Sequence, residues 1–252
     1  MIARAYKFSR PMKGFTLVEM AMVLMILGIL LSGVLVAIGD STNSIRITRT
    51  QNQLEMLEEA LYGFAQANGR LPCPATDTSD GVESFTGNGV CDAANGMIPN
   101  VTLGVYGSVN EDGMLLDAWQ NPIRYSVSTA TYGGQRAFTY APALSGAFNT
   151  TNPLGSLAGS LISIYPDSSC SGTALSNNAP AIIYSMGENW ATYTSADETE
   201  NVETTLGASA YDVNNDTCFV DTEYNEDSFD DELRWLSPHI LFSRLIKAGQ
   251  LP

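Results

Sequence analysis

Basic residues are scarce in this chain. Its 252 residues include 12 Lys and Arg against 27 Asp and Glu, and four of the 12 lie within the first 14 positions. The remainder therefore has 8 basic residues against 27 acidic ones, a formal charge of −19. A body this acidic repels nucleic acid phosphates, so we expect no nucleic acid partner. The charge fits solubility, cation binding or a basic partner equally well.

Residue types that carry enzyme chemistry are also few. His239 is the only histidine; it stands beside apolar residues, and no serine or cysteine elbow motif accompanies it. The chain has no nucleotide-binding loop. Its scattered carboxylates cannot be paired from sequence, so a hydrolase gains no positive support. We therefore expect a protein that is not an enzyme and requires no cofactor.

Only four cysteines are present, and all of them lie downstream of residue 70: Cys73, Cys91, Cys170 and Cys218. An even count in a segment that would be exported favours two disulfides. Three connectivities are possible, and Cys73–Cys91 with Cys170–Cys218 is the most local. Zinc and free thiols are the alternatives, but no two cysteines have the paired-ligand spacing of a zinc site.

One long apolar run, residues 15–38, carries a single charge, Glu19. At ~1.5 Å per residue this run is long enough to cross a ~30 Å hydrocarbon core as a helix. The basic residues before it should stay in the cytoplasm, which would place the remaining chain outside. A secretory signal peptide is the alternative. However, no clear Ala-x-Ala cleavage site follows, and the run continues into an amphipathic segment.

That amphipathic segment repeats apolar residues at three- and four-residue steps: Leu54, Leu57, Leu61 and Phe64. Glutamates lie largely between them, as on a helix with one buried face. The segment should end near Gly69, because a Leu-Pro pair follows. A helix from Phe15 to this point would be on the order of 80 Å long.

The remaining chain has the pattern of a half-buried antiparallel sheet with the amphipathic helix as its cover. We predict strands at 123–128, 137–140, 161–165, 181–185 and 218–220, and a long ordered loop at 75–112. Ser237, Pro238 and Gly249 predict the cap, first turn and end of a short C-terminal helix. No internal repeat or interdomain linker is visible, so one exported domain is expected.

The junction before the apolar run reads Lys13-Gly14-Phe15-Thr16-Leu17-Val18-Glu19. A basic leader, a glycine, a phenylalanine and an acid at this offset resemble the type IV prepilin and pseudopilin signal. The resemblance implies that a prepilin peptidase cuts between Gly14 and Phe15 and that Phe15 becomes the N-methylated first residue.

Two further segments resemble type II secretion pseudopilins. Residues 117–125 look like their D-x-W-G-N-P-x-x-Y turn and strand, with Gln120 in place of the glycine, and residues 184–187 with 230–235 look like the last strand and its closing loop. The implied fold is α+β and pilin-like: one long N-terminal helix, membrane-spanning in its first half, packs on an antiparallel sheet. Long disulfide-pinned loops and a short C-terminal helix complete it.

Glu19 has a physical reason to act in assembly. A carboxylate in hydrocarbon costs about 2.5–3.5 kcal/mol and needs a partner. Once the leader is removed, the α-amine at Phe15 of a neighbouring subunit can supply one and fix the axial register between subunits. An acid that reaches interfacial water is the alternative.

The acidic stretch 188–232 is where a metal could bind. In related pseudopilins the corresponding loop can hold calcium, and oxygens recur here at Asp212, Asn214, Asp216 and Glu223. Thr217 replaces the turn glycine of an EF-hand, so the segment is not an EF-hand by rule. The alternative is a solvated acidic loop held by Cys218.

These observations predict a leader at 1–14, a transmembrane or filament-core helix at 15–38, its amphipathic continuation at 39–70 and an exported domain at 71–252. The expected protein is a non-enzymatic minor pilin or pseudopilin of a pilus or secretion filament. Its partners would be other pilin subunits, prepilin peptidase and an inner-membrane assembly platform. It would cross the inner membrane once, with a periplasmic body, before joining the pilus or pseudopilus; a location at the cell surface is the alternative. An adhesive tip subunit, binding through 75–112 and 142–180, is the alternative.

Overall fold

A computed structural model describes most of the chain: residues 14–87, 89–148, 157, 159, 161–192, 195–202, 213–214, 216–225 and 228–252, with only the backbone for 31–41. The chain divides into two compact units between Ile45 and Arg46. The helices of the described part include none that is long and apolar enough to cross a membrane. The predicted span 15–38 is covered only in part, since the side chains of 31–38 lie outside the described residues.

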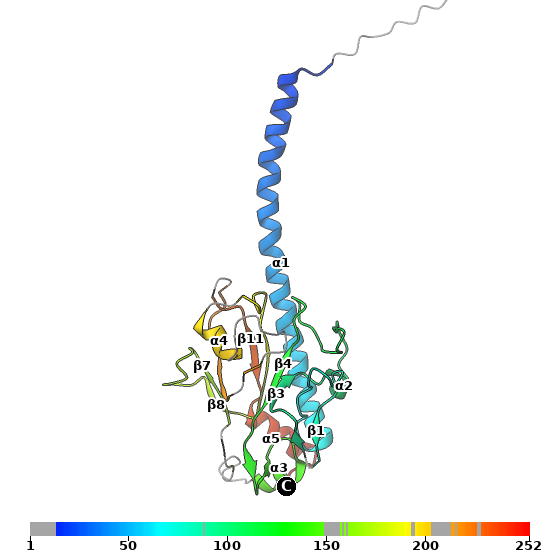
Figure 1. Cartoon of the computed structure of the whole chain (residues 1–252), viewed down its shortest axis with the longest axis vertical. Helices are drawn as coiled ribbons and strands as arrows, with labels where there is room; N and C mark the ends of the chain where they lie inside the picture. Colours follow the sequence, from blue (N-terminus) through cyan, green and yellow to red (C-terminus); the bar gives the residue numbers. More distant parts are fainter. Residues whose placement is uncertain are drawn as a thin grey trace, which may run out of the picture. The chain divides into compact units, whose positions relative to one another are not determined.

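Helix α1 (Leu17–Asn68) is continuous over 52 residues (Figure 1). It ends where its sequence predicts, because Gly69 adopts a left-handed φ of 67° and donates its N–H to the Ala65 carbonyl at 2.8 Å. The next residue but one, Leu71, is fully buried, so the chain turns at once from the helix into the body.

The largest sheet is antiparallel and four-stranded, in the order β11-β9-β4-β3. Its strands are Asn95–Met97 (β3), Arg124–Val127 (β4), Ala181–Ser185 (β9) and Glu232–Trp235 (β11). The strands predicted at 123–128 and 181–185 are therefore confirmed. The mixed α/β architecture, with an N-terminal helix, antiparallel sheets and disulfides, is confirmed as well.

A second sheet, in the order β10-β7-β8, contains a parallel pair that the sequence reading did not anticipate. Its strands are Ile162–Tyr165 (β7), Ser176–Ala179 (β8) and Cys218–Val220 (β10), and β10 runs parallel to β7. Parallel pairing needs a long connection, which the chain between Tyr165 and Cys218 provides.

Two sequence expectations about regular structure are wrong. Residues 137–140 form a turn and not the predicted strand. The Ala137 N–H bonds to the Ala130 carbonyl, whereas the Phe138 carbonyl accepts from Leu71 N, so the segment does not pair with any one neighbouring strand. Residues 75–112, predicted as one loop, contain short elements: Phe85–Thr86 (β1), Val90–Cys91 (β2), β3 and Asn100–Leu103 (α2). The described part also contains Thr131–Tyr132 (β5), Gln135–Arg136 (β6), Ala141–Ala147 (α3), Ala196–Val202 (α4) and Pro238–Lys247 (α5).

Strand β9 separates two hydrophobic cores. All five of its residues are buried, and alternate side chains point to opposite faces. Ile183 belongs to the core that contains Leu57 and Leu61 of α1 together with residues of β4 and α5. Ile182 belongs to the second core, with Phe219 of β10. The chain thus buries a central strand on both sides.

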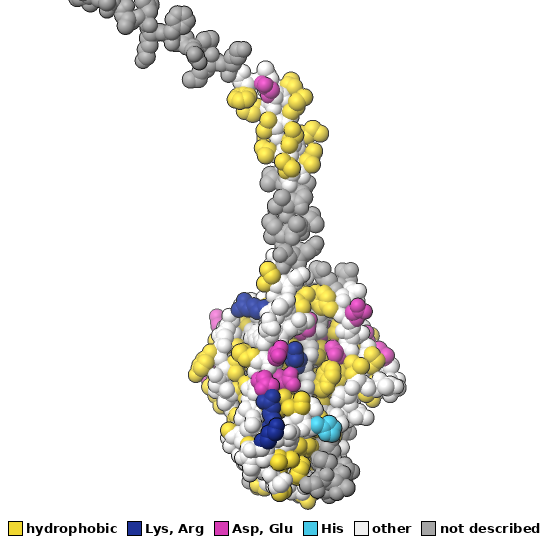
Figure 2. Space-filling view, turned by 180° about the vertical axis from the view of Figure 1, so that it is seen from behind, with side chains coloured by type: hydrophobic (Ala, Val, Ile, Leu, Met, Phe, Trp, Pro, Cys, Tyr) yellow, Lys and Arg dark blue, Asp and Glu magenta, His cyan; other side chains and the backbone are white. Residues whose placement is uncertain are grey.

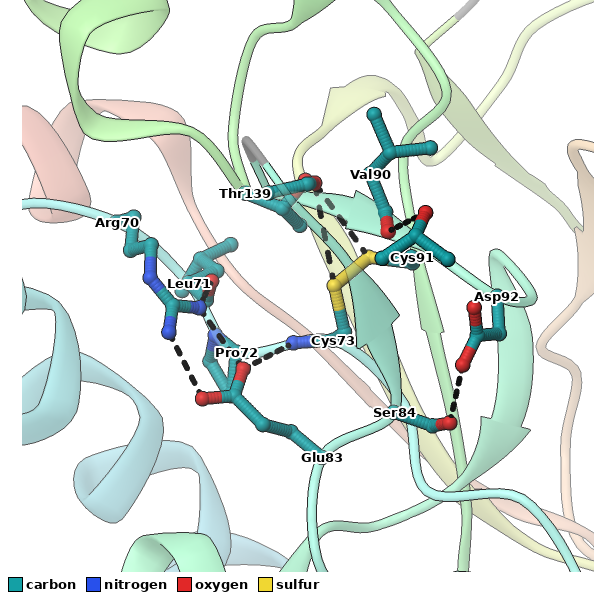
Figure 3. The surroundings of a disulfide bond; sticks show 12 residues. Arg70, Leu71, Pro72, Cys73, Glu83, Ser84, Val90, Cys91, Asp92 and Thr139 are labelled. Carbon is teal, nitrogen blue, oxygen red and sulfur yellow. Dashed lines mark hydrogen bonds and ion pairs between the residues drawn. A yellow bond between two sulfur atoms is a disulfide. The ribbon is translucent and has the colours of Figure 1, made fainter.

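Two disulfides are present, and both join the local pairs, Cys73–Cys91 and Cys170–Cys218. Figure 3 shows the first, just after α1. Beside it, Arg70 binds Glu83 through two N–H···O bonds of 2.8 Å, and Glu83 also accepts the Cys73 N–H at 3.0 Å. The disulfide and this ion pair together tie the end of α1 to the segment that carries β1 and β2.

Helix α5 begins at Pro238, as predicted, with Ser237 at the N-cap position. The Ser237 side chain makes no capping hydrogen bond; instead its N–H donates to the Tyr62 hydroxyl of α1 at 2.9 Å. Gly249 follows the helix with a φ of 74°. The helix start is therefore fixed by a contact with α1 in place of a side-chain cap.

Candidate functional site

The predicted cleavage point lies in an open stretch of chain. Gly14, Phe15 and Thr16 precede α1 without regular secondary structure, and the Phe15 side chain is 79% exposed. A peptidase needs an accessible, extendable backbone, and this segment provides one. The basic residues predicted to precede it, up to Lys13, lie outside the described residues.

Glu19 forms a capping box with Thr16 at the start of α1. Glu19 N donates to Thr16 Oγ1 at 3.2 Å, while Thr16 N and Thr16 Oγ1 donate to Glu19 Oε2 at 3.0 and 3.1 Å. Within one chain the Glu19 carboxylate therefore has a partner and organises the first helical turn. Pairing with the amine of a neighbour stays a prediction.

The first turns of α1 expose apolar side chains on every face. Described residues with at least half of their surface exposed include Leu17, Val18, Met22, Leu24, Met25, Ile26, Ile29 and Leu30. A contiguous apolar surface of this kind marks contact with lipid or with other protein. These side chains form what we call the apolar shaft.

The turn at the start of the first pseudopilin-like segment, residues 117–125, is locked by Asp117. Its Oδ1 accepts the N–H groups of Trp119 and Asn121 at 2.8 and 2.9 Å, and its Oδ2 accepts the Ser185 hydroxyl at 2.5 Å. Asn121 Nδ2 donates to the Gly187 carbonyl at 2.6 Å. The two segments that resemble pseudopilins thus contact each other. Burial, only partly offset by these bonds, raises the pKa of Asp117.

Three acidic residues, Glu198, Asp230 and Asp231, form a buried carboxylate cluster. One oxygen from each lies within 4.8 Å of the others, and the residues are 0%, 3% and 4% exposed. Glu198 is held on α4 by Ser195, whose Oγ accepts the Glu198 N–H at 3.1 Å. The aspartates immediately precede β11. Gly187, with a φ of 61°, faces Asp230, and a Cβ there would overlap the Asp230 carboxylate.

The carboxylate cluster is only half satisfied by hydrogen bonds. Asp230 Oδ2 accepts the N–H groups of Glu188 and Asn189 at 2.7 and 3.2 Å, and Asp231 Oδ2 accepts Asn201 Nδ2 at 2.7 Å. Among the described atoms, Asp230 Oδ1, Asp231 Oδ1 and Asn189 Oδ1 are buried without a partner. Buried oxygens in this state call for a cation or a proton.

Burial also shifts the acidity of the cluster. Desolvation raises the pKa of Asp230 to about 6, against two backbone hydrogen bonds that lower it. It raises the pKa of Asp231 well above its usual range, with Asn201 and the Arg124 guanidinium acting in the opposite direction. Oxygen-rich, poorly compensated and negatively charged, the cluster is a donor set suited to Ca²⁺.

The calcium ligands predicted from the sequence are differently placed. Asp212 lies outside the described residues. Asn214 is fully buried; its Nδ2 donates to the Glu200 and Cys218 carbonyls, and its Oδ1 accepts the Asp216 N–H. Asp216 in turn accepts the Cys218 N–H, and Glu223 is exposed. Asn214 and Asp216 thus build the turn into β10. The Asp230-Asp231 doublet was the sequence signal for the buried cluster, but Glu198 could not be linked to it from spacing.

Comparison with protein-family models matches residues 9–35 to the prokaryotic N-terminal methylation motif. Searches of curated proteins and of solved structures returned no significant match. The motif implies processing by a prepilin peptidase, a membrane-anchored stage and assembly with other pilin subunits, and it favours a structural subunit over an enzyme. The chain therefore carries the prepilin-type methylation signal at its N-terminus, which supports a type IV pilin-like protein.

Proposed function

We propose that this chain is a non-enzymatic structural subunit, a minor pilin or pseudopilin, of a type IV pilus or type II secretion-like filament. The observation that carries the proposal is the methylation motif at residues 9–35, a range that includes the apolar shaft. Prepilin peptidase cuts between Gly14 and Phe15 and methylates the new N-terminus. The body remains on the periplasmic side until the subunit is extracted into the filament by a separate assembly platform.

Assembly in this proposal changes the partner of Glu19. In the single chain the carboxylate caps α1 through Thr16. In the filament it pairs with the Phe15 amine of a neighbour, which neutralises two charges that are otherwise costly in an apolar medium. The shaft side chains then pack against other shafts in place of lipid.

Replacement of Gly14 tests the processing step. Gly14→Val should leave full-length protein in the membrane, because the residue before the cut no longer fits the peptidase. Gly28→Val is the matched control, since a Cβ at either glycine meets no atom within 4 Å. N-terminal sequencing of the native protein should begin at Phe15. Normal-sized product from the Gly14 variant, or a different first residue, contradicts the proposal.

We also propose that calcium supports the body through the carboxylate cluster, in place of the ligands predicted from the sequence. The support is three buried, unpartnered oxygens and too little positive charge around them. Glu198, Asp230, Asp231 and Asn189 would hold the ion, which would supply the compensating charge. Addition of Ca²⁺ to the chelated protein should raise its melting temperature. Asp231→Asn should reduce that gain, and no gain in the unaltered protein rejects the site.

A tip-located adhesive subunit remains the second candidate, because the loop around α2 exposes large apolar side chains. Tyr106 is 92% exposed, and Val101 and Val109 are about half exposed in the same segment (55% and 49%). Immunogold labelling separates the two roles. Label along the filament shaft supports a shaft subunit, whereas label confined to the tips supports the adhesive one.

A further inference from the structure

A groove of about 560 Å³ lies where α1, β11 and the start of α5 meet. Its apolar wall includes Leu54 and Trp235, and its polar wall includes Glu58, Asp221, Glu232 and Arg234. The groove is of the size that takes a side chain or a small ligand. Figure 2 shows acidic and basic side chains gathered on one face of the body, near the single histidine.

The groove holds more negative charge than its own cation compensates. Arg234 is shared between Glu58 at 3.5 Å and Glu55 at 3.7 Å. Glu232 receives only the neutral amide of Gln51, at 3.1 and 3.2 Å. In the described part of the chain, the Asp221 carboxylate has no hydrogen bond or ion pair. Among the described residues, these two carboxylates therefore stand in a partly buried groove without an ion pair, and Glu232 feels the Arg234 charge only at longer range.

Desolvation raises the pKa of Asp221 and of Glu232, and the Asp221 charge raises the pKa of Glu232 further. In the single chain, the ionised carboxylates of the groove therefore lack enough compensating positive charge. A cation from elsewhere would relieve this repulsion. The apolar wall beside it would accept the aliphatic stem of a long basic side chain.

Free cations are rare in the described body. Arg46, Arg70, Arg234 and Arg244 pair with carboxylates, and the Arg136 guanidinium bonds to the Thr129 carbonyl. Arg49 and Lys247 are exposed and form no described ion pair or hydrogen bond. Arg49 lies on α1, five residues before Leu54 and nine before Glu58, which corresponds to about 8 and 13 Å along the helix axis.

We propose that the groove of one subunit receives Arg49 from a second copy of this chain. The proposal rests on the function proposed above, in which every copy has its N-terminal helix anchored in the same direction. When two parallel copies are displaced by about 10 Å along α1, Arg49 of one copy lies at the same height as the groove of the other. A contact that joins different patches on two copies is heterologous, and it repeats without closing, as a filament requires.

Arginine suits this groove better than lysine does. Its planar guanidinium stacks on an aromatic face and binds two carboxylate oxygens at once. Trp235 is the aromatic residue that lines the groove, and Asp221 with Glu232 supplies the carboxylates. Lys247 has the same charge but lies in the last turn of α5, so it serves as the control cation.

Charge exchange in the full-length chain, made in cells that assemble the filament, tests the contact. We expect Arg49→Glu and Asp221→Arg each to lower the sheared filament yield about tenfold, and the double variant to restore it to within about twofold. Arg49→Lys should give an intermediate yield, and Lys247→Glu an unchanged one. Asp221 is chosen because it has no internal partner whose loss would unfold the body; an unchanged membrane pool of processed subunit verifies folding.

A photo-crosslinking residue, p-benzoylphenylalanine, at position 49 gives an independent readout. The expected product is a dimer of this chain, with the crosslinked peptide in the region of residues 221–235. A crosslink only to a different protein, or normal filament yield from Arg49→Glu, overturns the contact while leaving the proposed function intact. Absence of filaments from the unaltered chain, with a mature N-terminus other than Phe15, overturns the proposed function and this contact with it.

Discussion

At the scale of single residues, the turn held by Asp117 contains a non-glycine residue at a position where the backbone conformation favours glycine. Gln120 has a φ of 71°, a left-handed conformation that costs an ordinary residue about 1 kcal/mol or more. It occupies the position at which the resembling motif has glycine. The Asp117 side chain holds the turn through its bonds to Trp119 N and Asn121 N, so the strain is tolerated.

Gln120→Gly should therefore stabilise the protein, by about 0.5–1 kcal/mol once the greater freedom of glycine in the unfolded chain is subtracted. Chemical denaturation measures the change. Ala118→Gly, in the same turn but without a positive φ, should instead lower stability. Equal effects of the two substitutions would show that the left-handed conformation is not the cause.

The buried Asp230 predicts a pH dependence in the presence of a chelator. Its folded pKa of about 6 exceeds the unfolded value near 3.8, so between these values the folded state binds more protons. Stability should fall as pH rises from about 4 to about 6, by roughly 2–3 kcal/mol from this group. The difference in stability between Asp230→Asn and the unaltered protein isolates the effect. A difference that does not vary with pH in this window contradicts it.

At the scale of elements, the sequence was most informative where one local pattern determines the structure. The end of α1 at Gly69, the strands β4, β9 and β10, and the start of α5 at Pro238 follow from periodicity and from residues with few backbone choices. The long-range arrangements did not follow from it. The parallel register of β10 on β7 and the approach of Glu198 to Asp230 depend on contacts between segments distant in sequence.

The Cys73–Cys91 disulfide should stabilise the elements that follow α1. It closes a segment with a sequence separation of 18 residues, for which chain entropy gives about 3 kcal/mol. Substitution of both cysteines by alanine should lower the free energy of unfolding by this order. Under reducing conditions the unaltered protein should lose more than this, because the Cys170–Cys218 disulfide is reduced as well. A double variant as stable as the parent would show that the Arg70–Glu83 ion pair alone ties the segment to the helix.

At the scale of the whole molecule, the division between Ile45 and Arg46 separates the apolar shaft from the body. A chain that begins at Arg46 keeps the leucines of α1 that belong to the core, such as Leu57 and Leu61. It should fold, stay monomeric and need no detergent, which sedimentation velocity can measure. Association as strong as that of the full chain would show that the body, and not the shaft, drives assembly.

The position of strand β9 between two cores affects how the subunit unfolds. Since its alternate side chains supply two cores at once, neither core can melt without removing one wall of the other. Opening should then be all-or-none. Damage near the acidic loop would open the core that contains the α1 leucines as well. A protease would therefore meet either an intact subunit or a fully accessible chain, with few half-open forms available for misassembly.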